Sequence, residues 1–155
     1  MAIINPIFEN LVVRKLVLGE SDYFFQLLEL FKEVFEETRN IPGPSYLEKL
    51  LVNNDFLVFV ALSESKILGG LTIYCLPQYF SEKPLAYIYD LAVLPAYQGN
   101  GIGQSLISSV IDYCGKNNFE AIYVEAEAED IGAIRFYRKT ALQEEKHAIH
   151  FTFDY

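Results

Sequence analysis

The sequence contains few of the residues on which metal centres and disulfide frameworks depend. Only two cysteines and two histidines occur among its 155 residues. Cys75 and Cys114 lie in apolar contexts, without the spacing of a metal site or a disulfide pair. His147 and His150 are three residues apart, which on a strand places them on opposite faces. We therefore expect no bound metal and no structural disulfide.

Basic residues are also scarce, with 12 Lys and Arg against 21 Asp and Glu and a net charge of −9. Binding to nucleic acid or to an anionic membrane depends on basic residues that neutralise phosphates, so we expect neither partner. The longest clear apolar run, 56–62, is too short to span a bilayer. The first residues lack a basic region followed by a hydrophobic core, which is the pattern of a secretion signal. These absences predict a cytoplasmic protein that attracts cations.

What the chain does contain is enough apolar material for one core. Hydrophobic residues make up 52% of the sequence and aromatic residues 15%. A chain of this length buries most of its apolar surface as one domain. No repeat, linker or low-complexity segment divides it, so we predict a single domain over residues 1–155.

Hydrophobic periodicity gives the order β-α-α-β-β-β-α-β-α-β. This order combines hairpin links with crossover links. It predicts an α/β (α+β) protein with a single mixed, mostly antiparallel sheet and flanking helices. The expected strands are 11–16, 56–62, 67–76, 87–93, 121–124 and one within 144–153. The expected helices are one capped by Ser21 or Asp22 with apolar residues through Phe35, one capped by Ser45 and running through Leu51, one at 102–113 and one around 133–139.

A glycine-rich segment joins the strand at 87–93 to the helix at 102–113. Glycine permits positive φ and a close approach of the backbone to a ligand. A helix start adds unpaired N–H groups and a partial positive charge, so the segment predicts a pyrophosphate-binding turn. Its residues are Gln98, Gly99, Asn100, Gly101, Ile102 and Gly103, followed by Gln104.

Three kinds of phosphate-binding loop have this setting, and the residues separate them. A Walker loop ends in Gly-Lys-Ser/Thr, whereas Gln104 follows Gly103 here. A dinucleotide fingerprint needs glycine at position 104. Glu125 matches the ribose-binding acid of that fold, but the thirty residues after it are too few for the remaining βαβ units. The third pattern, Gln/Arg-x-x-Gly-x-Gly/Ala, is met in full by residues 98–103.

This third pattern resembles the coenzyme A loop of the Gcn5-related N-acetyltransferases (GNAT). A second segment, Asp130-Ile-Gly-Ala-Ile-Arg-Phe-Tyr137, is similar to the family's later motif Asn-x-x-Ala-x-x-Phe-Tyr. Asp130 replaces the usual asparagine, and Ala141 stands where a glycine usually follows the helix. With the order of elements, the resemblance covers nearly the whole chain. It implies the GNAT fold and acetyl-CoA as cosubstrate.

The resemblance also implies which residues hold the coenzyme. Backbone groups of the strand before the loop would hold the pantetheine arm and the acetyl carbonyl, because the parallel strands 87–93 and 121–124 splay apart. The loop would take the pyrophosphate. The expected cofactor-binding residues are Leu91, Ala92, Val93, Gln98, Gly99, Asn100, Gly101, Ile102, Gly103, Gln104, Asp130, Ala133, Phe136 and Tyr137.

Two residues are candidates for proton transfer. Tyr137 matches the family tyrosine that donates a proton to the coenzyme thiolate, and a phenol with a pKa of about 10 suits a thiol with a pKa of about 8.5. Asp90 is costly to bury as an ion unless a cation pairs with it, and an amine substrate would be that cation. Alternation predicts that Asp90 shares a strand face with Ile88, opposite Tyr87 and Tyr89. The structural alternatives are a packed tyrosine and a carboxylate satisfied by backbone N–H groups or by an arginine.

Acidic residues gather after the strand at 121–124, at the expected mouth of the site. Such runs are commonly solvated surface, but in this place they would concentrate a polycation. Segments 87–93, 122–127, 30–37 and 46–51 are similar to aminoglycoside 3-N-acetyltransferases of the gentamicin type. That resemblance implies contacts between acids and substrate amines. The expected substrate-binding residues are Tyr89, Asp90, Glu125, Glu127 and Glu37.

The sequence thus predicts acetyl transfer from acetyl-CoA to a primary amine of a polycationic small molecule. By resemblance this is the 3-amino group of an aminoglycoside, which implies antibiotic resistance. No Ser-His-Asp or Cys-His set is apparent, so direct attack with Asp90 as base and Tyr137 as acid is preferred. The alternatives are another amine acceptor, such as a polyamine, peptide or metabolite, and a non-catalytic coenzyme A-binding domain. The aromatic tail 149–155 predicts a homodimer.

Overall fold

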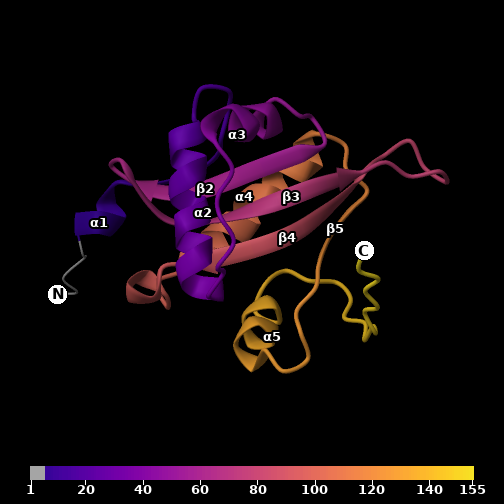
Figure 1. The fold of residues 1–155 in the computed structure, drawn as a ribbon. Helices are drawn as coiled ribbons and strands as arrows, with labels where there is room; N and C mark the ends of the chain where they lie inside the picture. Colours follow the sequence, from indigo (N-terminus) through magenta and orange to yellow (C-terminus); the bar gives the residue numbers. More distant parts are fainter. Residues whose placement is uncertain (1–5) are drawn as a thin grey trace. The chain divides into compact units, whose positions relative to one another are not determined.

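A computed structural model describes residues 6–155 of the chain (Figure 1). The chain forms two compact units, divided after Glu125. Among residues 6–155, the first unit contains every strand, and the second contains one helix and the C-terminal segment. The elements are α1 (Pro6–Glu9), β1 (Leu11–Lys15), α2 (Ser21–Phe35), α3 (Pro44–Leu51), β2 (Phe56–Ser63), β3 (Lys66–Leu76), β4 (Leu85–Val93), a 3₁₀ turn (Pro95–Tyr97), α4 (Ile102–Lys116), β5 (Ala121–Val124) and α5 (Ile131–Tyr137).

The first unit is built on one mixed sheet with the strand order β1-β2-β3-β4-β5. The three pairings from β1 to β4 are antiparallel, and β5 pairs with β4 in parallel. The mixed, mostly antiparallel sheet predicted from the sequence is therefore confirmed. The parallel pairing runs from Leu85 and Ala121 to Ile88 and Val124 and stops there.

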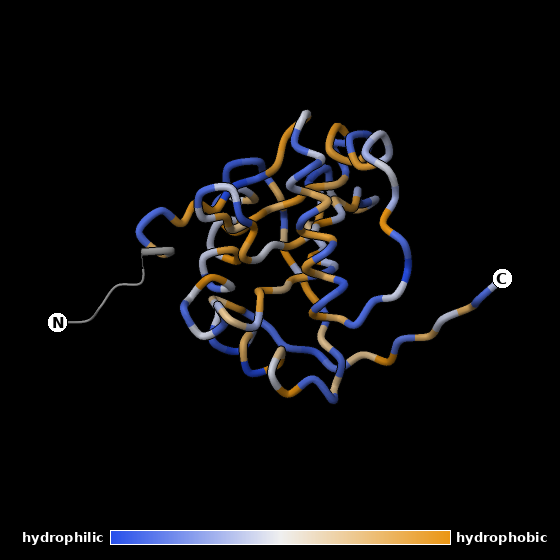
Figure 2. The backbone as a smooth tube through the Cα atoms, turned by 60° about the vertical axis from the view of Figure 1, so that its left-hand side comes forward, coloured by the Kyte–Doolittle hydropathy of each residue, from blue (hydrophilic) through white to orange (hydrophobic). Residues whose placement is uncertain are grey.

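Helices α2 and α3 cover one face of this sheet and α4 covers the other (Figure 1). The apolar side chains of α2 lie at helical spacing, and Leu27 is fully buried against the sheet. Gly70 of β3 makes this close packing possible, because an added Cβ would lie 2.6 Å from Leu27 Cδ1. The strands and the inward helix faces are largely apolar in Figure 2, whereas most loops are polar.

The predicted element order is confirmed from β1 to α5, with small differences at the starts of α3 and α5. The short helix α1 had no signal in the sequence analysis. Helix α3 begins at Pro44, after Gly43, and not at Ser45. Proline suits the first helical position because its φ is fixed and it has no N–H to leave unpaired.

The strand expected within residues 144–153 is not formed. Residues 142–155 have no strand or helix, and their side chains are exposed. Apolar and polar residues nevertheless alternate along this segment, as the C-terminal end of the tube in Figure 2 shows. Alternation is the signal of a half-buried strand, but a strand also needs a partner for its ladder hydrogen bonds. In the structure, residues 144–153 have no such ladder partner.

Candidate active site

The glycine loop has the backbone geometry of an anion-binding turn. β4 ends at Val93, the 3₁₀ turn follows, and α4 begins at Ile102. Gly99 and Gly101 have φ angles of 76° and 83°, in the left-handed region that favours glycine. A Cβ added to either glycine would meet no atom within 4 Å, so the space beside both is open. The unpaired N–H groups at the start of α4 complete a cradle that fits a pyrophosphate.

Side chains of the loop hold this cradle together from within. Gln98 Nε2 donates to the carbonyl of Val93 at 3.0 Å. Asn100 Nδ2 donates to the carbonyls of Tyr97 and Gln98 at 3.1 and 3.0 Å. Ile102 is buried and anchors the first turn of α4. Gln98, Asn100 and Ile102 thus shape the loop with their side chains, while their backbone groups are available to a ligand.

The second half of β4 has a free edge next to the loop. Its parallel pairing with β5 ends at Ile88, so residues 89–93 have no strand partner on that side within the first unit. Backbone N–H and C=O groups along such an edge remain available for hydrogen bonds. Leu91, Ala92 and Val93 lie in this stretch, as the predicted splay of the two strands requires.

A β-bulge at Tyr89 changes the faces of β4. Thr72 of β3 pairs with Asp90 and Ile73 pairs with Ile88, so Tyr89 has no partner of its own. Residues that pair across an antiparallel ladder lie on the same face. Because Thr72 and Ile73 are consecutive, Asp90 and Ile88 lie on opposite faces. The prediction that they share a face is wrong, since a bulge adds one residue to the alternation.

The bulge joins Asp90 to four tyrosines on the sheet face that α2 covers. Tyr74 pairs with Tyr87, and it lies two residues from Thr72 on β3. Tyr87 stacks on Tyr123 with ring centroids 4.8 Å apart. Tyr89 contacts Tyr74 and Tyr87 edge-on, at 5.4 and 6.0 Å. We call Tyr74, Tyr87, Tyr89 and Tyr123 the tyrosine cluster.

Of the tyrosine cluster, the sequence analysis named only Tyr89 as a substrate-binding residue. The available signal for Tyr87 was its place in the segment Tyr87-Ile-Tyr-Asp90, two residues before Tyr89. Tyr123 follows from the parallel register, in which it pairs with Tyr87. Without that register, nothing in the sequence distinguishes Tyr123 from the other tyrosines, of which the chain has eleven in all. Tyr74 reaches Tyr89 through the bulge, which has no signature in this sequence.

Two acids expected to bind substrate lie at this face of the first unit. Glu125 accepts a hydrogen bond from the Tyr87 hydroxyl at 3.2 Å. Burial raises the pKa of Tyr87, and the neighbouring Glu125 raises that pKa further. Glu37 follows α2, and its charge raises the pKa of Asp90. The structure therefore brings Glu37 near Asp90 and links Glu125 to Tyr89 through Tyr87.

Asp90 itself is half-buried, and its surroundings disfavour the ionised form. Burial raises the pKa of the Asp90 carboxyl, Arg39 lowers it and Glu37 raises it. Among residues 6–125, no hydrogen bond ends on this carboxylate. A carboxyl with a raised pKa is a better proton acceptor than an ordinary aspartate, so it suits the role of a general base.

The second unit contains the remaining predicted site residues, on and before α5. Asp130 caps this helix, because its Oδ1 accepts the N–H of Ala133 at 2.9 Å. Aspartate performs this capping as well as asparagine does. Phe136 and Tyr137 lie in the last turn, with ring centroids 5.0 Å apart. Glu127 lies in the turn before α5, where its carbonyl accepts the N–H of Asp130 at 3.0 Å.

Comparison with models of protein families identifies the family to which the chain belongs. Residues 24–141 match the model of the acetyltransferase (GNAT) family, which is more than half of the chain. The chain belongs to the GNAT family. The match begins in α2, includes the glycine loop and ends just after α5. Members of the family use acetyl-CoA, which the open cradle at Gly99 and Gly101 fits.

Solved GNAT structures include close relatives of the chain. It is 44% identical to aminoglycoside acetyltransferase meta-AAC0020, from an uncultured soil metagenomic sample and solved in complex with sisomicin. That match covers 96% of this chain and 99% of the other, with a TM-score of 0.93. A second soil aminoglycoside acetyltransferase, HMB0005, is 33% identical with a TM-score of 0.86, over 94% of this chain and 98% of the other.

Curated relatives match over a shorter stretch. N-acetyltransferase MJ1207 of Methanocaldococcus jannaschii is 31% identical over 65 residues, which is 42% of this chain and 29% of that protein. The chain spans less than a third of the length of the curated relatives that it matches.

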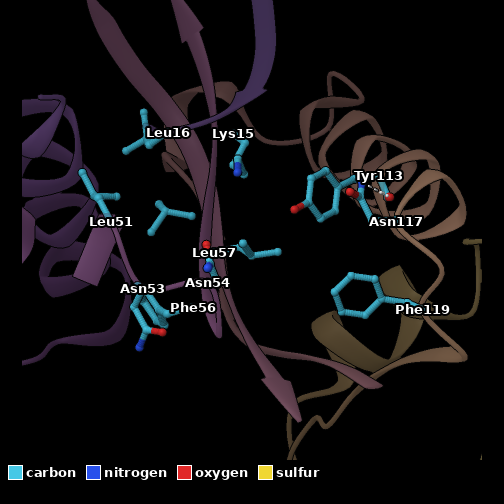
Figure 3. A pocket seen from close by; sticks show the side chains of 11 residues that line it. Lys15, Leu16, Leu51, Asn53, Asn54, Phe56, Leu57, Tyr113, Asn117 and Phe119 are labelled. Carbon is cyan, nitrogen blue, oxygen red and sulfur yellow. Dashed lines mark hydrogen bonds between the residues drawn. The ribbon is translucent and has the colours of Figure 1, made fainter. Parts of the chain in front are cut away.

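Other features of the first unit do not belong to the GNAT site. A hollow of about 310 Å³ is lined by Lys15, Asn53, Tyr113 and Asn117, among others (Figure 3). It lies at the C-terminal end of α4, whereas the glycine loop lies at the N-terminal end. A helix of 15 residues separates these two ends by roughly 20 Å. Within residues 6–155, no group of His, Cys, Asp or Glu could hold a metal ion, and no helix is long and apolar enough to cross a membrane.

Proposed function

We propose that the protein transfers the acetyl group of acetyl-CoA to a primary amine of an aminoglycoside, at the 3-amino position. One observation carries the proposal. The half-buried Asp90 lies beside the tyrosine cluster and two further acids, on the strand whose free edge leads into the glycine loop. The strand therefore connects a place for an amine with a place for the coenzyme. The neighbours meta-AAC0020 and HMB0005 are aminoglycoside acetyltransferases, which supports this acceptor class.

The coenzyme would be held mainly by backbone groups. When bound, acetyl-CoA supplies an acetyl group activated as a thioester. The N–H groups of residues 99–104 would hold the pyrophosphate, and the free edge of Leu91, Ala92 and Val93 would hold the pantetheine arm. Arg135 in α5, and Arg138 and Lys139 just after it, place positive charges at the end of this helix in a protein of net charge −9, although Arg138 is paired with Glu145. These charges favour an anionic coenzyme.

The acceptor would be held by charge and by aromatic faces. Asp90, Glu37 and Glu125 can each pair with an ammonium group, and Glu127 of the second unit would add a fourth acid. Tyr89 is 58% exposed and offers its ring to sugar C–H groups and to cations. Several acids acting on one ligand favour a polyamine sugar over a neutral acceptor.

Two residues would move protons in the reaction. Asp90 would accept the amine proton, directly or through water, which leaves the nitrogen lone pair free to attack the thioester carbonyl. Tyr137 would donate its phenolic proton to the departing thiolate sulfur. Direct attack is preferred over an acyl-enzyme because no activated nucleophile is apparent in the sequence. The base and the acid are separate residues, so they can be tested separately.

The function can be tested by measuring release of the coenzyme thiol. Purified protein and acetyl-CoA are mixed with sisomicin, with spermidine and with a peptide amine. We expect rapid thiol release with sisomicin and mass-spectrometric addition of one acetyl group at its 3-amino nitrogen. Preferred turnover of spermidine or of the peptide would reassign the acceptor. Coenzyme binding without turnover of any amine would indicate a non-catalytic coenzyme A-binding domain.

Ionic strength should separate a polycationic acceptor from a neutral one. We expect the KM for sisomicin to rise with added salt while kcat changes little. Salt shortens the reach of the acidic field to about 8 Å at physiological strength, which weakens attraction of the acceptor. The measurement is a series of KM values from 20 to 500 mM salt (a total change of about fivefold in screening length), with acetyl-CoA saturating. A KM that does not respond to salt would contradict the assignment of a multiply charged acceptor.

We also propose that the protein is a cytoplasmic homodimer. Cys75 and Cys114 are buried free thiols, which suits a reducing compartment. Ile149, Phe151 and Phe153 are 82, 76 and 84% exposed, although alternation would place all three on one face of a strand. Light scattering at micromolar concentration should give twice the monomer mass. Replacing Phe151 and Phe153 by serine should yield monomers, and a monomeric wild type would contradict the proposal.

A further inference from the structure

Glu37 lies at a position where the end of a helix disfavours an acid. Glu36 ends α2 in the left-handed conformation, with φ 54°, and the Glu37 N–H donates to the carbonyl of Lys32 at 3.1 Å. The last carbonyls of a helix carry a partial negative charge, so basic side chains are favoured there and carboxylates are not. Helix formation alone therefore does not explain Glu37. A nearby cation would offset this unfavourable charge.

In the structure that cation is Arg39. Its backbone N–H donates to Glu37 Oε1 at 2.8 Å, its Nε donates to Oε2 at 2.8 Å, and its Nη2 reaches the same oxygen. Arg39 lowers the pKa of Glu37 to about 2. The Arg39 side chain is 86% exposed, so Glu37 and not packing holds it in place. Exposed ion pairs of this kind are weak and are readily exchanged for another cation.

The guanidinium of Arg39 also acts on the residues proposed to bind the acceptor. Burial raises the pKa of Asp90, and the positive charge of Arg39 opposes that effect. Arg39 also interacts electrostatically with Tyr89. One side chain thus supplies positive charge to Glu37, Asp90 and Tyr89 together. These are three of the groups that an acceptor ammonium would contact.

We propose that Arg39 is an internal substitute for one ammonium group of the acceptor, held on Glu37 in the free enzyme and displaced when the acceptor binds. The inference rests on the proposed function, because it assigns the same acids to the acceptor. An amine that occupies Glu37 must first break the Arg39–Glu37 pair, so the free energy of that pair is subtracted from the free energy of binding. The pair therefore lowers the affinity of every such amine. Arg39 is then a specificity-determining residue. An acceptor must displace Arg39 to reach Glu37, and an acceptor with several positive charges does so more easily than an acceptor with one.

The test compares sisomicin binding in variants by calorimetry. Arg39→Gln removes the competing cation, and we expect the Kd for sisomicin to fall about two- to fivefold, the worth of an exposed ion pair. In the Glu37→Gln background the same substitution should have no such effect, because the competition is lost with the acid. Lys146→Gln is the matched control. It also removes one exposed positive charge from an ion pair, with Glu144 at 3.1 Å, and should leave the Kd unchanged.

Each of these Kd values tests the inference without any measurement of turnover. An unchanged or higher Kd in Arg39→Gln would overturn it, and so would an equal gain in Lys146→Gln or a gain that persists without Glu37. Failure of wild type and Arg39→Gln alike to bind sisomicin would overturn it as well. The thiol-release assay tests the proposed function separately. Tighter binding in Arg39→Gln without any thiol release would reject the proposed function and leave the competition for Glu37 standing.

Discussion

Asp90→Asn is expected to lower the rate of acetyl transfer by about 100-fold or more. The substitution keeps the shape of the side chain and removes the proposed proton acceptor. The loss should shrink as the pH rises, because more of the amine then arrives already deprotonated. In the wild type, activity should fall as the pH drops through the raised pKa of Asp90, whose carboxyl becomes protonated. The measurement is a pH–rate profile of both proteins with acetyl-CoA saturating.

Tyr137→Phe is the matched comparison for this profile. It removes a proposed proton donor, so high pH should not restore its activity, since a higher pH supplies no acid. Parallel profiles for Asp90→Asn and wild type, displaced by less than a few-fold, would instead identify Asp90 as a structural carboxylate. The base would then be sought at Glu125, Glu127 or a water held by backbone carbonyls.

Thermal stability distinguishes a lost base from a damaged fold in the same variant. Burial raises the pKa of Asp90 in the folded protein, so the folded state prefers the protonated form. The stabilisation from this group is complete below the unfolded pKa and is lost as the pH rises through the folded pKa. At pH 7 the ionised carboxylate therefore costs stability. We expect Asp90→Asn to have the Tm of wild type or a higher one at pH 7.

Gly101→Val should weaken coenzyme A binding by on the order of 2 kcal/mol, or about 30-fold. The φ of 83° at this position is strained for any residue with a Cβ, and the new side chain would enter the open space of the cradle. Calorimetric titration with coenzyme A measures the loss. Gly115→Ala, in the last turns of α4, is the control, because an added Cβ there meets no atom within 4 Å and the backbone is helical. Unchanged affinity in folded Gly101→Val would end the assignment of the loop.

The sequence was sufficient to predict the features that depend on local pattern. The strand, glycine turn and helix around residues 98–103 follow from residue types whose backbone preferences are strong. The boundaries of α2 and β5 follow from apolar periodicity. Family membership followed from two motifs at a fixed spacing. In each case the signal lies within a few consecutive residues, which is the range over which local preferences act.

The missed features depend on partners distant in the chain. The faces of β4 depend on its register with β3, and one unpaired residue, Tyr89, changes them. The expected strand within 144–153 has the correct alternation but no ladder partner in the structure. Arg39 had no distinguishing sequence pattern, and only its contacts with Glu37 and its charge near Asp90 indicate a role. The joint action of Asp90 and Tyr137 stays a prediction.

The bulge at Tyr89 has a consequence for how the protein can evolve. The ladder between β3 and β4 continues from Ile88 to Asp90 without a partner for residue 89. A change at this position therefore leaves the pairing of both flanking residues, and the buried side chains behind them, in the same register. Most strand positions cannot vary in this way, because they pair and pack at once. Under the proposed function, acceptor choice can thus drift through the ring at position 89, the most exposed of the tyrosine cluster, while selection on folding acts on its neighbours.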